Sequence, residues 1–160
     1  MPNVEVECYF SERWSVALSA MYADFAYKEK ARDRWSVSEI SVEPRVWPLA
    51  AGEFNWLNTG LFGGYGDFDV RGSAIDPDPE ALYGRTGRFW TLGASVGCLV
   101  PLAKGFSAEA SVRTGYRSVF DGKKYRYDKI DDKNYLENHF SSTGFMIGLK
   151  VSLLYRFQIR

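Results

Sequence analysis

The single histidine of the 160-residue chain, His139, lies two residues before Ser141 and close to Ser142. Residues two apart on a strand share a face, so such an imidazole and hydroxyl could act as base and nucleophile. Acidic side chains that could orient the imidazole precede them at Asp131, Asp132 and Glu137. A triad is defined by geometry, however, and a lone loop histidine is usually solvated. We therefore expect no catalytic residues, and a rim-site lipid-modifying enzyme or protease is an alternative only.

A second candidate is the segment 122–127, which mixes cations with aromatic rings and is predicted to lie in a long loop. Its ligand candidates are Lys123, Lys124 and Arg126. Cations beside rings suit the phosphates of lipopolysaccharide or a host glycan. The alternative is a solvated loop whose charge is balanced by the aspartates that follow.

Other chemistry is not indicated. The glycine-rich stretch 60–66 follows no strand-to-helix pattern, so it predicts close strand packing and not a phosphate cradle. Cys8 and Cys98 lack metal-type spacing and read as small apolar side chains, and whether they pair stays open. We expect no cofactor and no metal. Lys+Arg and Asp+Glu both number 20, so the basic excess of a nucleic-acid module is missing.

The elements that must position these residues are strands, because apolar residues recur with period two along most of the chain. The pattern is clearest over 87–101, 106–119 and 140–158. It predicts a single all-β domain, 1–160, of seven antiparallel strands: 2–10, 14–28, 35–47, 54–69, 87–101, 106–119 and 140–158. Pro44 within a strand predicts a bulge or a locally unpaired position. Glycines blur the two faces of 54–69, so no sides are assigned there.

The polar face of these strands combines small residues with charges of both signs. Such a face is typical of a narrow barrel lumen filled by ion pairs, since isolated buried charges are costly. The lumen ion-pair candidates are Glu39, Glu43, Arg45, Glu109, Arg113, Arg117 and Lys150. The alternative is a solvated outer face on a soluble barrel.

Aromatic residues make up 16% of the chain and gather at the predicted strand ends. Rings at the headgroup level flank the apolar belt of membrane barrels, whereas in a soluble barrel they would cap the core. The girdle candidates are Trp14, Trp35, Trp47, Trp56, Trp90, Tyr116, Tyr155 and Phe157. Trp35 and Trp47 are out of step with their strand's apolar positions and need a bulge or a rim position.

The predicted connections alternate between short and long, as the periplasmic turns and outer loops of outer-membrane barrels do. Seven strands would leave the two chain ends on opposite sides, whereas single-chain bacterial barrels have an even count. We therefore expect one further strand, and a signal peptide, before the first residue. An open sheet edge in lipid would leave backbone groups unsatisfied.

Several short motifs resemble the Bacteroidetes outer-membrane barrels grouped as domain of unknown function 3575. They are Pro2-Asn3-Val4-Glu5-Val6-Glu7, Arg13-Trp14-Ser15-Val16, Glu43-Pro44-Arg45-Val46-Trp47, Gly63-Gly64-Tyr65-Gly66, Gly115-Tyr116 and Val151-Ser152-Leu153-Leu154-Tyr155-Arg156-Phe157. The resemblance covers nearly the whole chain and implies a strand before the Pro-Asn segment. The closing Tyr155-x-Phe157 is similar to the terminal signal that the barrel-assembly machinery reads, although three residues follow it here. The resemblance implies no established activity.

Together these observations predict an up-and-down transmembrane β-barrel of the eight-stranded type in the bacterial outer membrane. An eight-stranded barrel is only wide enough to be filled by side chains, so a structural or surface-interaction protein is expected and not an open porin. Expected partners are outer-membrane lipid, the assembly machinery during insertion, and lipopolysaccharide or a surface partner, without nucleic acid. The alternative from another class is a soluble β-barrel that binds a small apolar ligand.

Overall fold

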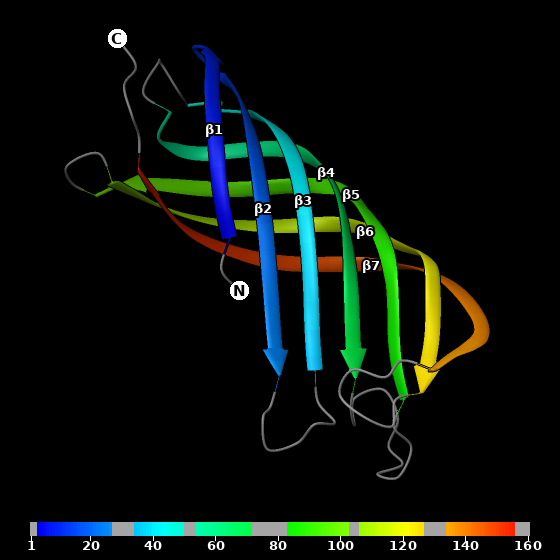
Figure 1. Cartoon of the computed structure of the whole chain (residues 1–160). Coiled ribbons are helices and arrows are strands. Elements are labelled where there is room, and N and C mark those ends of the chain that lie inside the picture. The colour runs from blue at the N-terminus through cyan, green and yellow to red at the C-terminus, as the bar shows by residue number, and fades with distance from the viewer. Residues whose placement is uncertain are drawn as a thin grey trace.

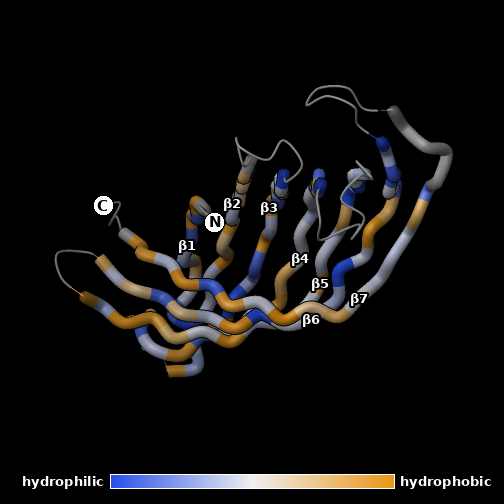
Figure 2. The backbone as a smooth tube through the Cα atoms, turned by 90° about the horizontal axis from the view of Figure 1, so that it is seen from below, coloured by the Kyte–Doolittle hydropathy of each residue, from blue (hydrophilic) through white to orange (hydrophobic). Residues whose placement is uncertain are grey.

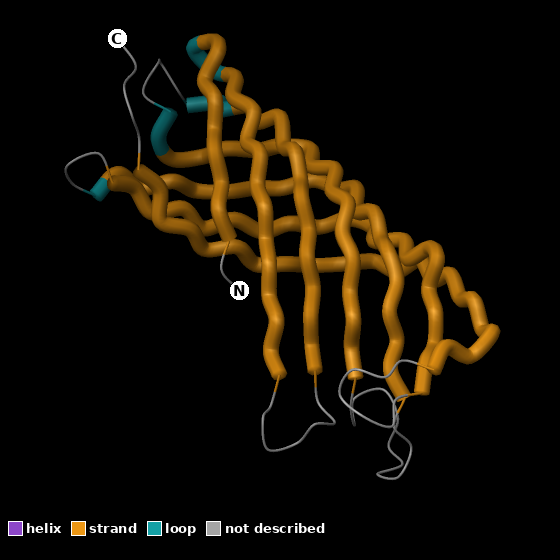
Figure 3. The backbone as a smooth tube through the Cα atoms, in the orientation of Figure 1, coloured by secondary structure: helices purple, strands orange, loops and turns teal. Residues whose placement is uncertain are grey.

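The computed structural model describes residues 3–26, 34–49, 54–71, 83–102, 106–126 and 134–155. Within these ranges the secondary structure is seven strands, coloured in chain order in Figure 1. They are β1 (Asn3–Ser11), β2 (Trp14–Ala26), β3 (Arg34–Val46), β4 (Trp56–Arg71), β5 (Tyr83–Pro101), β6 (Phe106–Arg126) and β7 (Asn134–Tyr155). In the described part, no helix is long and apolar enough to span a membrane (Figure 3).

Each strand pairs antiparallel with its neighbours in sequence, so the sheet order is β1 to β7 without a crossover. The all-β, up-and-down prediction is therefore confirmed. The turn end is the end of the strands at which β1 turns into β2, β4 begins and β5 finishes. The loop end is the opposite end of the strands, at which β2, β4 and β6 finish (Figure 1).

The strands extend further toward the loop end than the hydrophobic pattern indicates. β5 begins at Tyr83 and not at 87, β6 continues to Arg126, and β7 begins at Asn134 and not at 140. Backbone hydrogen bonds carry strand pairing, so polar side chains do not stop it. The β5–β6 pairing shifts register between Thr86 and Arg88, and the β6–β7 pairing shifts between Val119 and Gly122. These irregularities allow both ladders to continue past the point where alternation is lost.

Pro44 behaves as its position in a strand predicts. It pairs with Val16 on the β2 side. On the β4 side the register passes from Val42 opposite Gly63 to Arg45 opposite Gly60, without a partner for Pro44. The interruption falls where proline has no N–H to donate.

Rings packed over glycines hold the central strands together. Phe62 on β4 lies opposite Gly93 on β5, and Gly66 lies opposite Phe89. A methyl group on Gly93 would lie 2.8 Å from Phe62 Cζ, and one on Gly66 would lie 2.6 Å from Phe89 Cζ. The same arrangement recurs at Phe68–Gly87, Tyr125–Gly84 and Phe140–Gly122. Within 54–69, Gly66 provides space for the Phe89 ring, whereas Gly60 and Gly64 provide space for polar side chains of β3 and β5, which agrees with the close packing predicted for this stretch.

The sheet curls strongly, and β7 passes across the far side of the trough that β1 and β2 begin (Figures 1 and 2). Lys150 on β7 forms an ion pair with Glu5 on β1. No Cα of β1 lies within 8 Å of β7, however, and neither strand has a second partner among the described strands. The sheet therefore surrounds an interior, the lumen, and leaves a slot between β1 and β7.

Candidate functional site: the charged lumen

Strand alternation directs charged side chains into the lumen and apolar side chains outward. On β3, Ser41, Glu43 and Arg45 are buried, whereas Ile40 and Val42 on the alternate face are 63% and 46% exposed. Every strand exposes large apolar side chains on the opposite, outer face. The molecule therefore has a polar inside and an apolar outside, the reverse of a soluble barrel.

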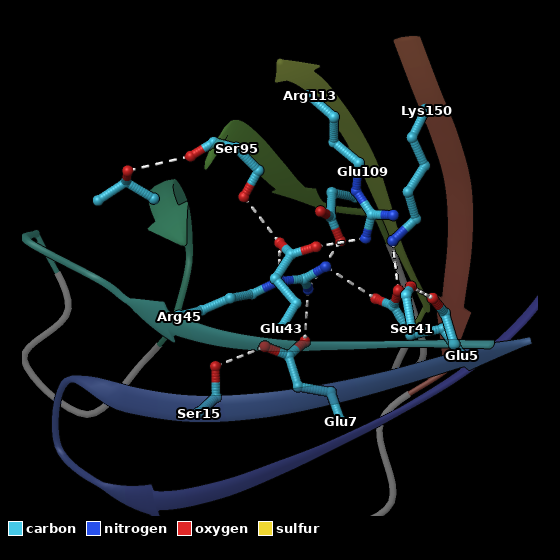
Figure 4. A network of polar contacts seen from close by, with 12 residues as sticks. Glu5, Glu7, Ser15, Ser41, Glu43, Arg45, Ser95, Glu109, Arg113 and Lys150 are labelled. Carbon is cyan, nitrogen blue, oxygen red and sulfur yellow. Dashed lines mark hydrogen bonds and ion pairs between the residues drawn. The ribbon is translucent and has the colours of Figure 1, made fainter. Parts of the chain in front are cut away.

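Arg45 is the centre of the lumen near the turn end (Figure 4). Its side chain is fully buried and contacts carboxylates from three strands. Its nitrogens lie 3.1 Å from Glu5, 3.2 Å from Glu7, 2.8 Å from Glu43 and 3.5 Å from Glu109. A guanidinium suits this position because its five N–H groups reach several acceptors at once.

Neutral hydroxyl groups satisfy further lone pairs of these carboxylates. Ser15 Oγ donates to Glu7 over 2.6 Å, and Tyr9 donates to the other oxygen of Glu7 over 2.9 Å. Ser95 Oγ donates to Glu43 over 2.9 Å. Buried charges are tolerated only when such bonds accompany ion pairing.

Two arginines on β6 extend the network toward the loop end. Arg113 pairs with Glu43, and its guanidinium lies 5.0 Å from the ring centre of Phe62. Arg117 lies 3.3 Å from Glu39 and 4.4 Å from the ring centre of Phe89. Each arginine is thus held by a β3 carboxylate and by an aromatic ring that itself packs over a glycine.

Each of these two β3 carboxylates, Glu39 and Glu43, also accepts a hydrogen bond from a hydroxyl group on β5. Thr91 donates to Glu39 over 3.0 Å, as Ser95 does to Glu43. Thr91 and Ser95 are four residues apart on β5, as Glu39 and Glu43 are on β3. Residues four apart on a strand point to the same face of the sheet. The lumen therefore repeats one unit of carboxylate, hydroxyl, arginine and ring at two heights.

An apolar plug closes the lumen at the turn end. Trp47 and Leu99 are both fully buried and pack against Tyr9, Phe54 and Leu154. Trp47 Nε1 donates to Ser15 Oγ over 2.8 Å, which links the plug to the ion network.

The structure brings all seven lumen candidates to the inner face and gives each an ion pair: Arg45, Glu43 and Glu109 in the lower cluster, Arg113 and Arg117 above it, Glu39 with Arg117, and Lys150 with Glu5. The sequence interpretation missed Glu5 and Glu7 as members. Their alternation with Val4, Val6 and Cys8 was the signal that could have placed them inside. With them, five carboxylates face four cations, so the lumen charge is nearly balanced.

The aromatic candidates divide into two groups. Trp14, Trp90 and Tyr116 lie on the outer face and are 47%, 43% and 58% exposed, and Trp56 is exposed at the start of β4. The girdle prediction is wrong for Trp47, which is fully buried in the turn-end plug. It is also wrong for Trp35, which shares the inner face of β3 with Glu39 and stacks on Phe25 at the lumen mouth. The side chain of Tyr155, and Phe157, lie outside the described residues.

The ligand candidates do not lie in a loop and do not converge. All three lie within β6, where successive side chains point to opposite faces. Lys124 and Arg126 therefore point to one face and Lys123 to the other. This corrects the predicted single basic loop, because β6 continues seven residues beyond its expected end at 119.

The structure shows no contact between the described residues His139 and Ser141 that would support the catalytic alternative. His139 and Ser141 lie exposed on β7, and within the described part no hydrogen bond joins them. Asp131, Asp132 and the side chain of Glu137 lie outside the described residues. Among the described residues no three His, Cys, Asp or Glu side chains are placed to hold a metal ion. Cys8 and Cys98 are free thiols on the exposed outer face.

No curated protein and no solved structure matches the chain. The family described as protein of unknown function (DUF3575) matches residues 1–157. This match spans nearly the whole chain, including all seven strands and every lumen residue described above, so the chain belongs to the DUF3575 family.

Proposed function

We propose that the chain is a small β-barrel of the bacterial outer membrane with a structural or surface-interaction role, neither a catalyst nor an open porin. The observation that carries this proposal is the inverted polarity of the sheet. Charged groups such as Arg45 and Glu109 are buried inside, whereas Leu92, Val96 and Leu149 are 60%, 55% and 77% exposed outside. A soluble barrel for an apolar ligand would need the opposite arrangement.

The height of the apolar outer surface supports a membrane location. On β5 the outward positions from Trp90 to Val100 are apolar. Ten residue steps of about 3.4 Å span about 34 Å, or about 26 Å along the normal of a membrane at a strand tilt of about 40°. The apolar band of outer-membrane barrels is about 25 Å tall.

The lumen contacts support a plugged barrel. The Arg45 cluster and the Trp47–Leu99 plug fill the turn-end half of the interior. We expect that purified protein in planar bilayers gives no stable conductance, and a long-lived ohmic channel would contradict this part of the proposal.

The proposal includes a further strand in the slot between β1 and β7. One strand placed between two others separates them by about 10 Å, twice the usual spacing. Lys150 on β7 and Glu5 on β1 form an ion pair although no Cα atoms of the two strands lie within 8 Å, which fits a slot of that width. Two unpaired edges in lipid would cost several kcal/mol per unsatisfied group, so closure is strongly favoured.

The decisive experiment is fractionation of cells that export the protein. We expect it in the outer-membrane fraction, resistant to urea extraction and with a heat-dependent mobility in gels. Val96→Arg should impair insertion, because a cation at mid-belt costs about 2–4 kcal/mol. Asp67→Arg, on the same outer face but beyond the apolar belt, is the control and should insert normally. Recovery of the wild type without detergent would refute the membrane proposal.

A further inference from the structure

A polar hollow lies on the outer face, beyond the apolar belt at the loop end. Its volume is about 520 Å³, and it is lined by Tyr65, Asp67, Thr86, Gly87, Arg88, Asp121 and Lys123. It lies outside the lumen, because Asp67 and Arg88 share the outer face with Tyr65 and Trp90.

The hollow occupies the level at which the outer face changes from apolar to charged. Tyr65 pairs with Trp90, and both belong to the apolar belt. The next outward pair along the same strands is Asp67 with Arg88. Tyr65 and Phe120 contact each other beside it, with ring centres 6.0 Å apart. In a membrane barrel, charges just beyond an aromatic band meet lipid headgroups.

Arg88 has no carboxylate partner among the described residues. Asp67, directly opposite on β4, accepts a hydrogen bond from Ser38 instead. In the part of the chain that the structure describes, no ion pair involves Arg88. The nearby Arg71 differs, because it donates to Tyr125 over 2.7 Å and lies 3.8 Å from Asp69. Arg88 is therefore the guanidinium that an external phosphate could engage through two N–H groups.

The lining charges decide the kind of headgroup. Arg88 and Lys123 provide two positive charges, and Asp67 and Asp121 provide two negative charges. Lys123 Nζ lies 3.8 Å from Asp121, a loose and exposed pair of the kind that contributes little. A hollow without net charge does not favour a purely anionic headgroup, whereas a headgroup with both signs can satisfy both kinds of side chain.

We propose that this hollow binds a lipid headgroup carrying both a phosphate and an ammonium group, as in phosphoethanolamine. The phosphate contacts Arg88 and Lys123, the ammonium contacts Asp67 and Asp121, and the acyl chains follow the apolar face below Tyr65 and Trp90. The inference rests on the membrane location proposed above. It replaces the grouping of Lys123 with Lys124 and Arg126 by a site that combines β4, β5 and β6.

The test compares lipids that remain bound to purified protein. Protein in detergent micelles is mixed with equal amounts of phosphatidylethanolamine and phosphatidylglycerol with identical acyl chains, and bound lipids are counted by native mass spectrometry. We expect a several-fold preference of the wild type for phosphatidylethanolamine. Asp67→Asn should abolish the preference, because Asp67 contacts the ammonium group that phosphatidylglycerol lacks, and Arg88→Gln should lower the binding of both lipids, because both carry the phosphate. Lys124→Gln, one residue from Lys123 but on the other face of β6, should keep the preference.

The outcomes separate this inference from the proposed function. Protein that fractionates with the outer membrane but binds both lipids equally, or prefers phosphatidylglycerol, overturns the headgroup site alone. An equal loss in Lys124→Gln would also overturn it, since the effect would then be one of overall charge. Protein that needs no detergent to stay in solution would refute both proposals. The wild-type preference needs no variant, so the test does not depend on how the substitutions fold.

Discussion

The two halves of the lumen hold their arginines in different ways. At the turn end, Arg45 is fully buried and contacts four carboxylates. Arg113, one level higher, is 15% exposed and pairs with Glu43, and Arg117, nearest the loop end, is 38% exposed and pairs with Glu39 alone. The more deeply buried arginine thus has more carboxylate partners, because burying a charge without partners is costly. We infer that the turn-end half determines stability, while the loop-end half contributes little.

The substitution with the largest expected effect is Arg45→Met. It leaves four buried carboxylates without their shared cation, which should lower the free energy of unfolding by about 3–5 kcal/mol or prevent folding. Urea titration in micelles, followed by tryptophan fluorescence, measures the loss. Adding Glu109→Gln should recover part of it, because one surplus charge is removed. A variant as stable as the wild type would show that the cluster is not the stabilising centre.

The turn-end plug should be nearly as sensitive. Trp47→Ala removes a fully buried ring and its bond to Ser15, for an expected loss of about 3–5 kcal/mol. Trp14→Ala is the matched control, since Trp14 lies nearby on the outer face and is 47% exposed. Its loss in the same titration should be clearly smaller. Equal losses would mean that the plug contributes no more than a lipid-facing ring.

The ring–glycine packing can be tested within one strand. Gly66→Ala forces a methyl group against the backbone oxygen of Ser38 and against Phe89 Cζ, so the free energy of unfolding should fall by about 1–3 kcal/mol. Gly63→Ala should be neutral or slightly stabilising, because the nearest neighbour of its methyl group is 4.0 Å away. If both variants unfold at the same urea concentration, the close packing of β3 and β5 around Gly66 does not require a glycine there.

The smallest effect is expected at the loop end. Arg117→Gln should cost at most about 1 kcal/mol, because the pair with Glu39 is partly solvated and screened by salt. Repeating the titration at high salt should reduce the difference further, whereas the Arg45→Met difference should persist. A loss as large as that of Arg45→Met would remove the distinction between the two halves.

Alternation predicted the seven strands and the seven lumen candidates, because a period of two is a local property that survives folding unchanged. The outward tryptophans followed from the same reasoning. Trp35 and Trp47 did not, although their odd parity matched that of Arg45 and already pointed inward. The mismatch was visible in the sequence, but the tendency of rings to lie at strand ends was given more weight than the parity of these two positions.

What alternation could not predict depends on other strands. The ends of β5, β6 and β7 were missed because polar residues beyond the apolar belt still form ladder hydrogen bonds. Glu5 and Glu7 were missed as ion-pair members because only the curl of the sheet brings β1 to Arg45 and Lys150. The hollow at Arg88 depends on the β4–β5 and β5–β6 registers, which no single segment encodes.

The strands lengthen along the chain, from 9 residues in β1 to 22 in β7. All pairings join neighbours in sequence, so each hairpin can form without waiting for distant parts of the chain. The β5–β6–β7 hairpins have the longest ladders and should form first and open last, while β1 should dock late and fray early. Amide hydrogen exchange would record this order as protection that is greatest in β5 and β6 and least in β1.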